Sequence, residues 1–76
     1  MIIGHKQRRI LQLIKNSPTY GYKISKELNI PLSTVYGHLK YLKDLNLIEK
    51  SSENKKRQIF YILSTKGKFL LKAIED

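Results

Sequence analysis

Cysteine and tryptophan are absent from this chain of 76 residues, and only six residues are acidic. Without cysteine the protein has no disulfide and no thiolate zinc site. His5 and His38 stand apart in the sequence, and two isolated histidines do not make a metal site. We therefore expect neither a metal nor any other cofactor.

Long apolar runs are absent as well, because none approaches the ~18 residues of a membrane-spanning helix. In the amino-terminal stretch MIIGHKQRR the basic residues follow a short apolar pair, which is the reverse of their order in a secretory signal. These two absences predict a cytoplasmic protein, in the host cell cytoplasm if its source is a virus, with no membrane partner.

Catalytic constellations are also missing. The sequence has no recognisable Ser/His/Asp or Cys/His set and no glycine-rich loop after a strand. The acidic residues are scattered and several adjoin lysines, which indicates surface ion pairs rather than a general acid and base. We expect that the protein is not an enzyme.

Positive charge is what the chain has in excess, since 15 lysines and arginines give a formal net charge of +9. A small basic domain commonly binds a polyanion, and nucleic acid is the first candidate. The alternative is a lysine-rich surface without a partner, as in many thermophile proteins.

Apolar residues at helical spacing predict the first elements. Ile10 and Ile14 lie on one face of an amphipathic helix over about residues 4–16. A second helix runs through the stretch YGYKISKEL, and either Ser17 or Thr19 is expected to cap it.

A third helix, predicted over about residues 32–45, buries Val35, Leu39 and Leu42 on one face. About three residues separate it from the second helix, which is the length of a helix-turn-helix. Asn46 follows, where an asparagine in the left-handed conformation can end a helix.

Two β-prone runs, LIEKS and QIFYILS, flank the polar stretch SENKKR and predict a hairpin, or wing, with its tip over about residues 51–58. Ser64 or Thr65 is expected to cap a last helix. The order helix, helix, helix, strand, strand, helix predicts an α+β, mainly helical fold, the winged helix-turn-helix. We expect one domain over residues 1–76.

The third helix is the predicted recognition helix, because the second helix of a helix-turn-helix lies in the major groove of DNA. Its outward face offers hydroxyls, rings and an ammonium group, but no Asn, Gln or Arg for bidentate reading of bases. The predicted DNA-binding residues of this helix are Ser33, Thr34, Tyr36, Gly37, Lys40 and Tyr41.

Gly37 costs the helix about 1 kcal/mol relative to alanine. Without a side chain it lets the backbone approach DNA closely and leaves Tyr36 room to move. Two alternatives stay open: a tolerated exposed glycine, or space for a neighbouring loop. His38 is expected to pack against the second helix, with DNA contact or a pH switch as alternatives.

Two further basic segments are expected to bind DNA. The wing suits flanking phosphates or a neighbouring minor groove, and the start of the second helix attracts phosphate through its free N–H groups. A solvated loop is the alternative for the wing. The predicted residues are Lys50, Lys55, Lys56 and Arg57 in the wing, with Thr19, Tyr22 and Lys23 at the helix start.

Apolar residues cover more of the last helix than one docking stripe needs, which predicts a second buried face and hence a homodimer. A two-fold dimer would read a palindrome in double-stranded DNA. The alternative is that this small domain uses all of its apolar surface internally. The predicted interface comprises Ile2, Ile3, Phe60, Ile62, Phe69, Leu70, Ala73 and Ile74.

Three stretches, YGYKISKEL, STVYGHLKYLKDLNLIEK and YILSTKG, resemble the PadR-like branch of the winged helix-turn-helix regulators, which shares features with MarR-like and ArsR-like proteins. The resemblance covers about residues 17–72. Ser64 stands where the family has Thr, and Asn46 replaces its usual Gly before the wing. The matching positions are Tyr20, Gly21, Tyr22, Tyr36, Tyr61, Leu63 and Gly67.

This resemblance implies a dimeric transcriptional regulator, usually a repressor. PadR-like proteins usually carry longer C-terminal helices, whereas this chain stops at Asp76, and the metal-sensing cysteines of ArsR-like proteins are absent. We therefore expect no small-molecule effector.

The leading prediction is thus a sequence-specific regulator that binds double-stranded DNA. One alternative is a sequence-tolerant architectural or RNA-binding winged helix, which would show steep salt dependence and little sequence preference. Another is a protein-interaction winged helix, in which the tyrosines and Phe60 form a docking surface and DNA affinity is absent.

Overall fold

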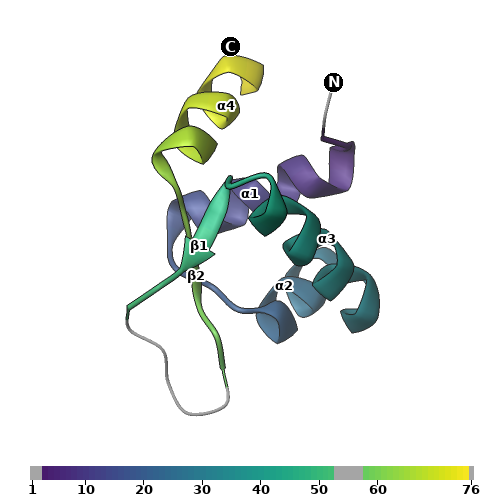
Figure 1. The fold of residues 1–76 in the computed structure, drawn as a ribbon. Helices are drawn as coiled ribbons and strands as arrows, with labels where there is room; N and C mark the ends of the chain where they lie inside the picture. The colour runs from purple at the N-terminus through teal and green to yellow at the C-terminus, as the bar shows by residue number, and fades with distance from the viewer. Residues whose placement is uncertain (1–2, 53–57, 76) are drawn as a thin grey trace.

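The computed structural model describes residues 3–52 and 58–75. Its elements follow the predicted order and confirm the mainly helical winged helix-turn-helix fold (Figure 1). They are α1 (His5–Asn16), α2 (Gly21–Leu28), α3 (Leu32–Asp44), β1 (Ile48–Lys50), β2 (Tyr61–Leu63) and α4 (Thr65–Glu75). None of the helices in the described part of the chain is long and apolar enough to cross a membrane.

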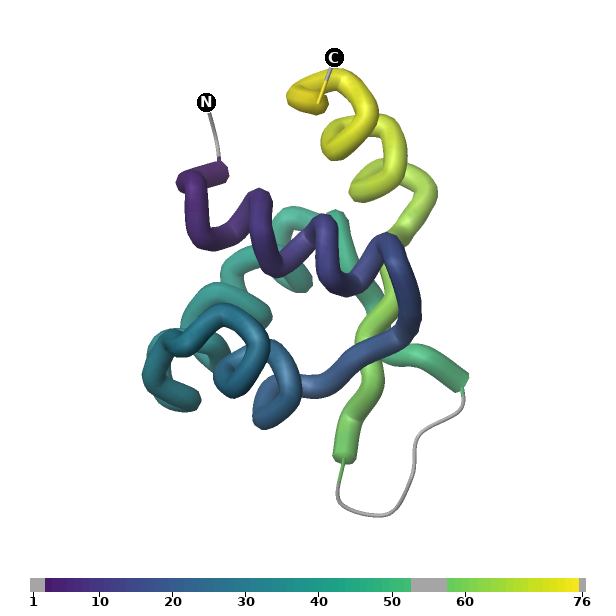
Figure 2. The backbone as a smooth tube through the Cα atoms, turned by 180° about the vertical axis from the view of Figure 1, so that it is seen from behind, coloured from purple at the N-terminus to yellow at the C-terminus, as the bar shows by residue number. Residues whose placement is uncertain are grey.

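Helix α1 is the central element of the fold. Figure 2 shows it crossing the middle of the molecule, with α4 on one side and the pair α2 and α3 on the other. It contacts α2, β2 and α4, and its residues Ile10, Leu11 and Ile14 are buried as their spacing predicted. These side chains join the hydrophobic core that also contains Ile24 of α2 and Leu71 of α4.

The turn between α2 and α3 is built from three residues and is fixed by local hydrogen bonds. Asn29 adopts the left-handed conformation with φ 55°, which ends α2. The hydroxyl of Ser25 donates to the carbonyl of Ile30 at 2.6 Å, while the Ile30 N–H donates to the carbonyl of Ser25 at 3.1 Å. Pro31 then precedes α3, where its fixed φ suits the start of a helix.

The segment before α2 is extended rather than capped by a hydroxyl, so the expectation that Ser17 or Thr19 caps this helix is wrong. Tyr20 occupies the N-cap position, and its side chain makes no capping hydrogen bond. Thr19 instead exchanges two backbone hydrogen bonds with Tyr61, at 3.3 and 2.8 Å. This bridge adds one antiparallel residue pair beside the hairpin of β1 and β2, in which Ile48 pairs with Leu63.

The start of α4 is fastened to the turn that follows α3. Asn46 has φ 62°, as expected for the residue that ends α3. The Ser64 hydroxyl caps α4 by accepting from the N–H of Gly67 at 3.0 Å, and it donates to the carbonyl of Asn46 at 2.6 Å. Gly67 lies so close to Leu47 that a Cβ atom there would overlap the Leu47 carbonyl oxygen.

Gly67 and Gly37, which both lie inside helices, give a matched test of this packing. We expect Gly67→Ala to lower the free energy of unfolding by about 1–3 kcal/mol, because the added methyl group overpacks against backbone. Gly37→Ala has no atom within 4 Å of the added Cβ and should raise the free energy of unfolding by about 0.4–1 kcal/mol. Urea unfolding measures both; a stable Gly67→Ala variant would contradict the close approach.

Candidate nucleic-acid interface

Helix α3 presents one buried and one exposed face. Val35, Leu39 and Leu42 point into the core, as their spacing predicted. The opposite face is exposed at every position predicted to bind DNA, and these positions are Ser33, Thr34, Tyr36, Gly37, Lys40 and Tyr41. The structure thus makes all of these side chains available, and their contacts with DNA stay a prediction.

Lys40 lies on the exposed face near the C-terminal end of α3. Its Nζ is 3.3 Å from Oδ2 of Asp44, one turn further along the helix. Exposed pairs of this kind contribute only about 0.3–0.5 kcal/mol, so the lysine can exchange Asp44 for another anion at little cost.

Gly37 faces open space, because nothing lies within 4 Å of the position that a Cβ would occupy. The alternative that this glycine makes room for a neighbouring loop is therefore wrong for the described part of the chain. The glycine that does make room is Gly21 at the start of α2. A Cβ there would lie 2.6 Å from Cε1 of Tyr36, so the tyrosine ring is seated on the α2 backbone.

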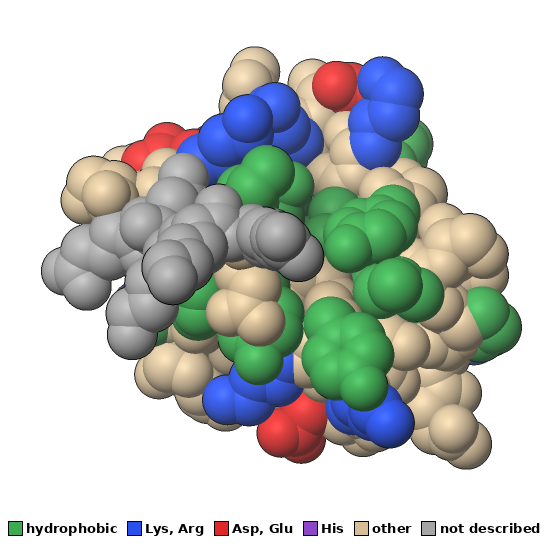
Figure 3. All heavy atoms as spheres, turned by 90° about the horizontal axis from the view of Figure 1, so that it is seen from below, with side chains coloured by type: hydrophobic (Ala, Val, Ile, Leu, Met, Phe, Trp, Pro, Cys, Tyr) green, Lys and Arg blue, Asp and Glu red, His purple; other side chains and the backbone are tan. Residues whose placement is uncertain are grey.

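A concavity of about 250 Å³ lies where α2, α3 and the chain before β2 converge, and we refer to it as the tyrosine pocket. Figure 3 views this side of the molecule from below and shows hydrophobic side chains gathered across it, with lysine and arginine side chains toward its edges. The pocket is lined by Tyr20, Gly21, Tyr22, Leu32, Tyr36, Gln58, Ile59 and Tyr61.

Tyr61 forms the back of the tyrosine pocket. Burial, and secondarily the proximity of the Tyr36 hydroxyl, raise the pKa of Tyr61 above its ordinary value of 10.0. The Tyr20 ring packs against the Phe60 ring, with ring centroids 4.9 Å apart. At the rim, the Nζ of Lys26 lies 5.4 Å from the centre of the Tyr22 ring, a cation–π contact.

The tyrosine pocket was only partly predicted. Tyr22 and Tyr36 were expected to bind DNA, whereas Leu32, Gln58 and Ile59 were not identified as site residues. The run Tyr-Gly-Tyr was the available signal, because a glycine between two tyrosines indicates a close approach of another group to the backbone.

The predicted DNA-binding residues outside α3 differ in their exposure to solvent. Thr19 is only 4% exposed and its backbone is bonded to Tyr61, so its assignment to DNA binding is wrong. Lys23, beside Tyr22 in the first turn of α2, and Lys50, at the end of β1, are both exposed. The wing residues Lys55, Lys56 and Arg57 lie outside the described residues.

One residue of the predicted dimer interface is buried within its own domain. Ile3 is 6% exposed and belongs to the hydrophobic core of its own domain, so it offers no surface to a partner. Ile2 lies outside the described residues. Phe69 is 72% exposed, and Ala73, one turn further along α4, is exposed as well. The remaining residues are half-buried: Phe60, Ile62, Leu70 and Ile74.

His38 contacts α1 through its side chain, and its expected packing against the second helix stays a prediction. Its Nδ1 is 3.1 Å from the side-chain nitrogen of Gln7, whose oxygen accepts from the N–H of Gly4 at 2.9 Å. The side chain of His38 therefore helps to hold the start of α1 on α3. In the described part of the chain, no three His, Asp or Glu side chains lie close enough together to hold a metal ion.

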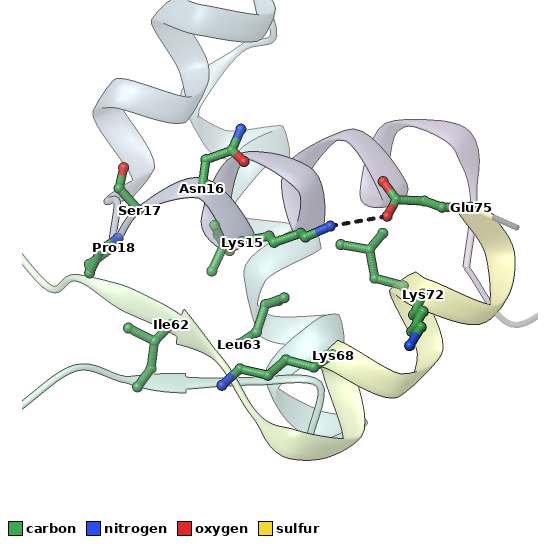
Figure 4. A pocket seen from close by; sticks show the side chains of 11 residues that line it. Lys15, Asn16, Ser17, Pro18, Ile62, Leu63, Lys68, Lys72 and Glu75 are labelled. Atoms are coloured by element: carbon green, nitrogen blue, oxygen red, sulfur yellow. Dashed lines mark hydrogen bonds and ion pairs between the residues drawn. The ribbon is translucent and has the colours of Figure 1, made fainter.

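A second cavity of about 740 Å³ lies between the end of α1, β2 and α4, and it shares no lining residue with the tyrosine pocket (Figure 4). Glu75 closes one end by accepting from Lys15 Nζ at 3.4 Å and from Gln12 Nε2 at 3.0 Å. Lys68 and Lys72 line the α4 side. These contacts join the ends of α1 and α4, far from the exposed face of α3.

Residues 5–50 match the family model described as "Bacterial regulatory protein, arsR family". The chain belongs to the arsR family. This agrees with the expected winged helix-turn-helix regulator, while the PadR-like branch is not confirmed. In sequence, this ArsR-family chain is 36% identical over 63 residues to the uncharacterized HTH-type transcriptional regulator MJ1398 of Methanocaldococcus jannaschii. That match covers 83% of the chain and 16% of the relative.

Solved structures of winged-helix regulators superpose on this ArsR-family chain. Lactococcus lactis ZitR in complex with DNA has a TM-score of 0.81 and 28% identity, and the match covers 92% of this chain and 49% of ZitR. Reduced HlyU from Vibrio cholerae has a TM-score of 0.80 and 21% identity, covering 93% of this chain and 74% of HlyU. The chain thus spans about half the length of ZitR.

The raised pKa of Tyr61 in this ArsR-family domain predicts a loss of stability in alkali. Because the folded state keeps the hydroxyl neutral while the unfolded chain ionises it, the contribution of Tyr61 is complete below about pH 10 and is lost as pH rises through the folded pKa. We expect the free energy of unfolding to fall less between about pH 8 and about pH 11 in Tyr61→Phe than in the wild type. Equal declines would contradict the assignment.

Proposed function

We propose that this chain is a transcriptional regulator that binds double-stranded DNA sequence-specifically, with α3 in the major groove. The observation that carries the proposal is the exposed face of α3, which presents hydroxyls, a tyrosine ring and the bare backbone of Gly37 opposite a fully buried stripe. Its similarity to ZitR, which has been solved in complex with DNA, supports the same conclusion.

The remaining contacts follow from the geometry of a helix-turn-helix. Ser33 and Thr34 lie in the first turn of α3, the part of a recognition helix that meets base edges. Lys23 in the first turn of α2 and Lys50 at the base of the wing suit phosphates, as do the wing residues Lys55, Lys56 and Arg57. The net charge of +9 favours association with any nucleic acid.

Repression is the regulatory outcome that needs the fewest additional surfaces. A protein that occupies promoter DNA blocks access by volume alone, whereas an activator also needs a surface that contacts the transcription machinery. We therefore propose a repressor.

A second candidate is favoured by one observation. The exposed face of α3 has no Asn, Gln or Arg, which are the side chains that most often discriminate between base pairs. A sequence-tolerant DNA- or RNA-binding winged helix fits this composition. Selection of sites from a random duplex pool distinguishes the two, since a sequence-specific protein enriches a motif and a tolerant one enriches none.

A carboxylate at position 37 should prevent binding to the groove. We expect Gly37→Glu to weaken affinity for the selected duplex by roughly 100-fold or more, because a like charge placed against DNA costs several kcal/mol. Thr65→Glu is the matched control, with the same charge change at the exposed first turn of α4. Thermal unfolding verifies that both variants fold. Normal binding by Gly37→Glu would show that α3 does not enter a groove.

We also propose that the regulator is a homodimer that reads a palindrome, with half-sites roughly 34 Å apart. Phe69 supports this proposal, because a phenylalanine that is 72% exposed on α4 leaves a large apolar group in water. Ala73 continues the same helix face and allows close approach of a partner helix.

Sedimentation tests this arrangement. We expect the wild-type chain to be a dimer at micromolar concentration and Phe69→Ser to weaken the dimer by about tenfold to 100-fold, since burial of such a side chain contributes roughly 1.5–3 kcal/mol. Tyr22→Ser, which removes an exposed ring from α2, should leave the dimer intact, because α2 and α4 lie at opposite ends of the molecule (Figure 1). A monomeric wild-type protein would contradict the proposed dimer.

A further inference from the structure

We propose that the tyrosine pocket is a specificity site that receives the 5-methyl group of thymine, so that the operator is recognised through apolar contacts with A·T pairs. This inference rests on the proposed function, because it requires α3 to lie in the major groove. It adds the chemical feature of DNA that this face reads.

The composition of α3 leaves few other means of reading bases. In the major groove a base pair is distinguished by its hydrogen-bonding groups or, for thymine alone, by a methyl group. The exposed face of α3 lacks Asn, Gln and Arg, and Lys40 lies near its C-terminal end beside Asp44. The chemistry that remains is the apolar surface of the tyrosine rings, together with the hydroxyls of Ser33, Thr34, Tyr36 and Tyr41.

The position of the tyrosine pocket suits contact with a base edge. Leu32 and Tyr36 bring it to the N-terminal part of α3, which is where a recognition helix meets bases. Tyr36 is 54% exposed, and Tyr22 and Ile59 are exposed beside it. These groups place apolar surface in water, and a methyl group brought against them would remove part of that surface from solvent.

Two rings that line the tyrosine pocket, those of Tyr36 and Tyr20, pack against neighbouring groups in the free protein. The Tyr36 ring rests on the backbone of Gly21, and Tyr20 is braced by Phe60 at 4.9 Å. Binding therefore does not need to order these rings, which lowers its entropic cost. Gly37, next to Tyr36 and open to solvent, allows the helix backbone to come close enough for the ring to reach a base.

The volume of the tyrosine pocket is sufficient for the methyl group of a base edge. Pockets for small molecules have volumes of about 300–1,000 Å³, and the tyrosine pocket, at about 250 Å³, lies below that range. A thymine methyl group needs only part of this space, while the rest of the base stays stacked in the duplex.

Uracil provides the test, because it differs from thymine only by the missing methyl group and pairs in the same way. One random duplex pool is prepared with thymine and another with uracil in its place, and the full chain selects sites from both. We expect a T-containing motif from the first pool. Replacing the thymines of the selected duplex one at a time by uracil should weaken binding about fourfold at each contacted position. Uracil outside the motif is the control and should have no effect.

Two variants show whether the tyrosine pocket is the methyl-binding site. Tyr36→Ala should weaken binding to the thymine duplex and abolish the difference between thymine and uracil, whereas Tyr36→Phe, which keeps the ring, should retain that difference. Ile59→Ser provides a second test at a residue outside the helices, and it should reduce the difference.

Three outcomes decide the inference. A thymine preference that disappears in Tyr36→Ala supports it. Tight, sequence-specific binding that is equal for thymine and uracil overturns it and leaves the proposed DNA-binding function standing. Absence of binding to any duplex overturns the proposed function and the inference together.

Discussion

The interaction on which this structure depends is the burial of one stripe of α3. Val35, Leu39 and Leu42 have almost no exposed surface, and their packing determines the rotation of the helix about its own axis. A rotation by one residue would carry a polar side chain into the core and one of these apolar side chains into water. Because these three apolar side chains must be buried, the residues on the opposite side of α3 are exposed, and this is the face that we propose binds DNA.

A second constraint acts between helices. Tyr36 is on the outward face, yet its ring lies on the backbone of Gly21, so α2 determines where this side chain points. The contact explains why a residue without a side chain begins α2. It also shows that the helix pair acts as one unit, in which α2 positions the residues that α3 exposes.

Much of this arrangement could be predicted from the sequence, and the reason is periodicity. The spacing of apolar residues identified the faces of α1 and α3, and Asn46 identified where α3 ends, because each of these signals is local. Contacts between distant residues left no such signal. The single residue pair between Thr19 and Tyr61 produces no strand pattern. Ile3 did carry a signal, because it lies seven residues before Ile10 and so at the spacing of the buried face of α1, but it was assigned to the dimer interface.

The bridge between Thr19 and Tyr61 makes one residue common to three parts of the structure. Tyr61 belongs to β2 through its backbone, is hydrogen-bonded to Thr19 two residues before α2, and lines the tyrosine pocket with its side chain. Tyr61 therefore connects the base of the hairpin to the entrance of α2 and to the tyrosine pocket through one residue. A substitution that displaced the backbone of β2 would thus alter both the lining of the tyrosine pocket and the hydrogen bonds that hold the segment before α2.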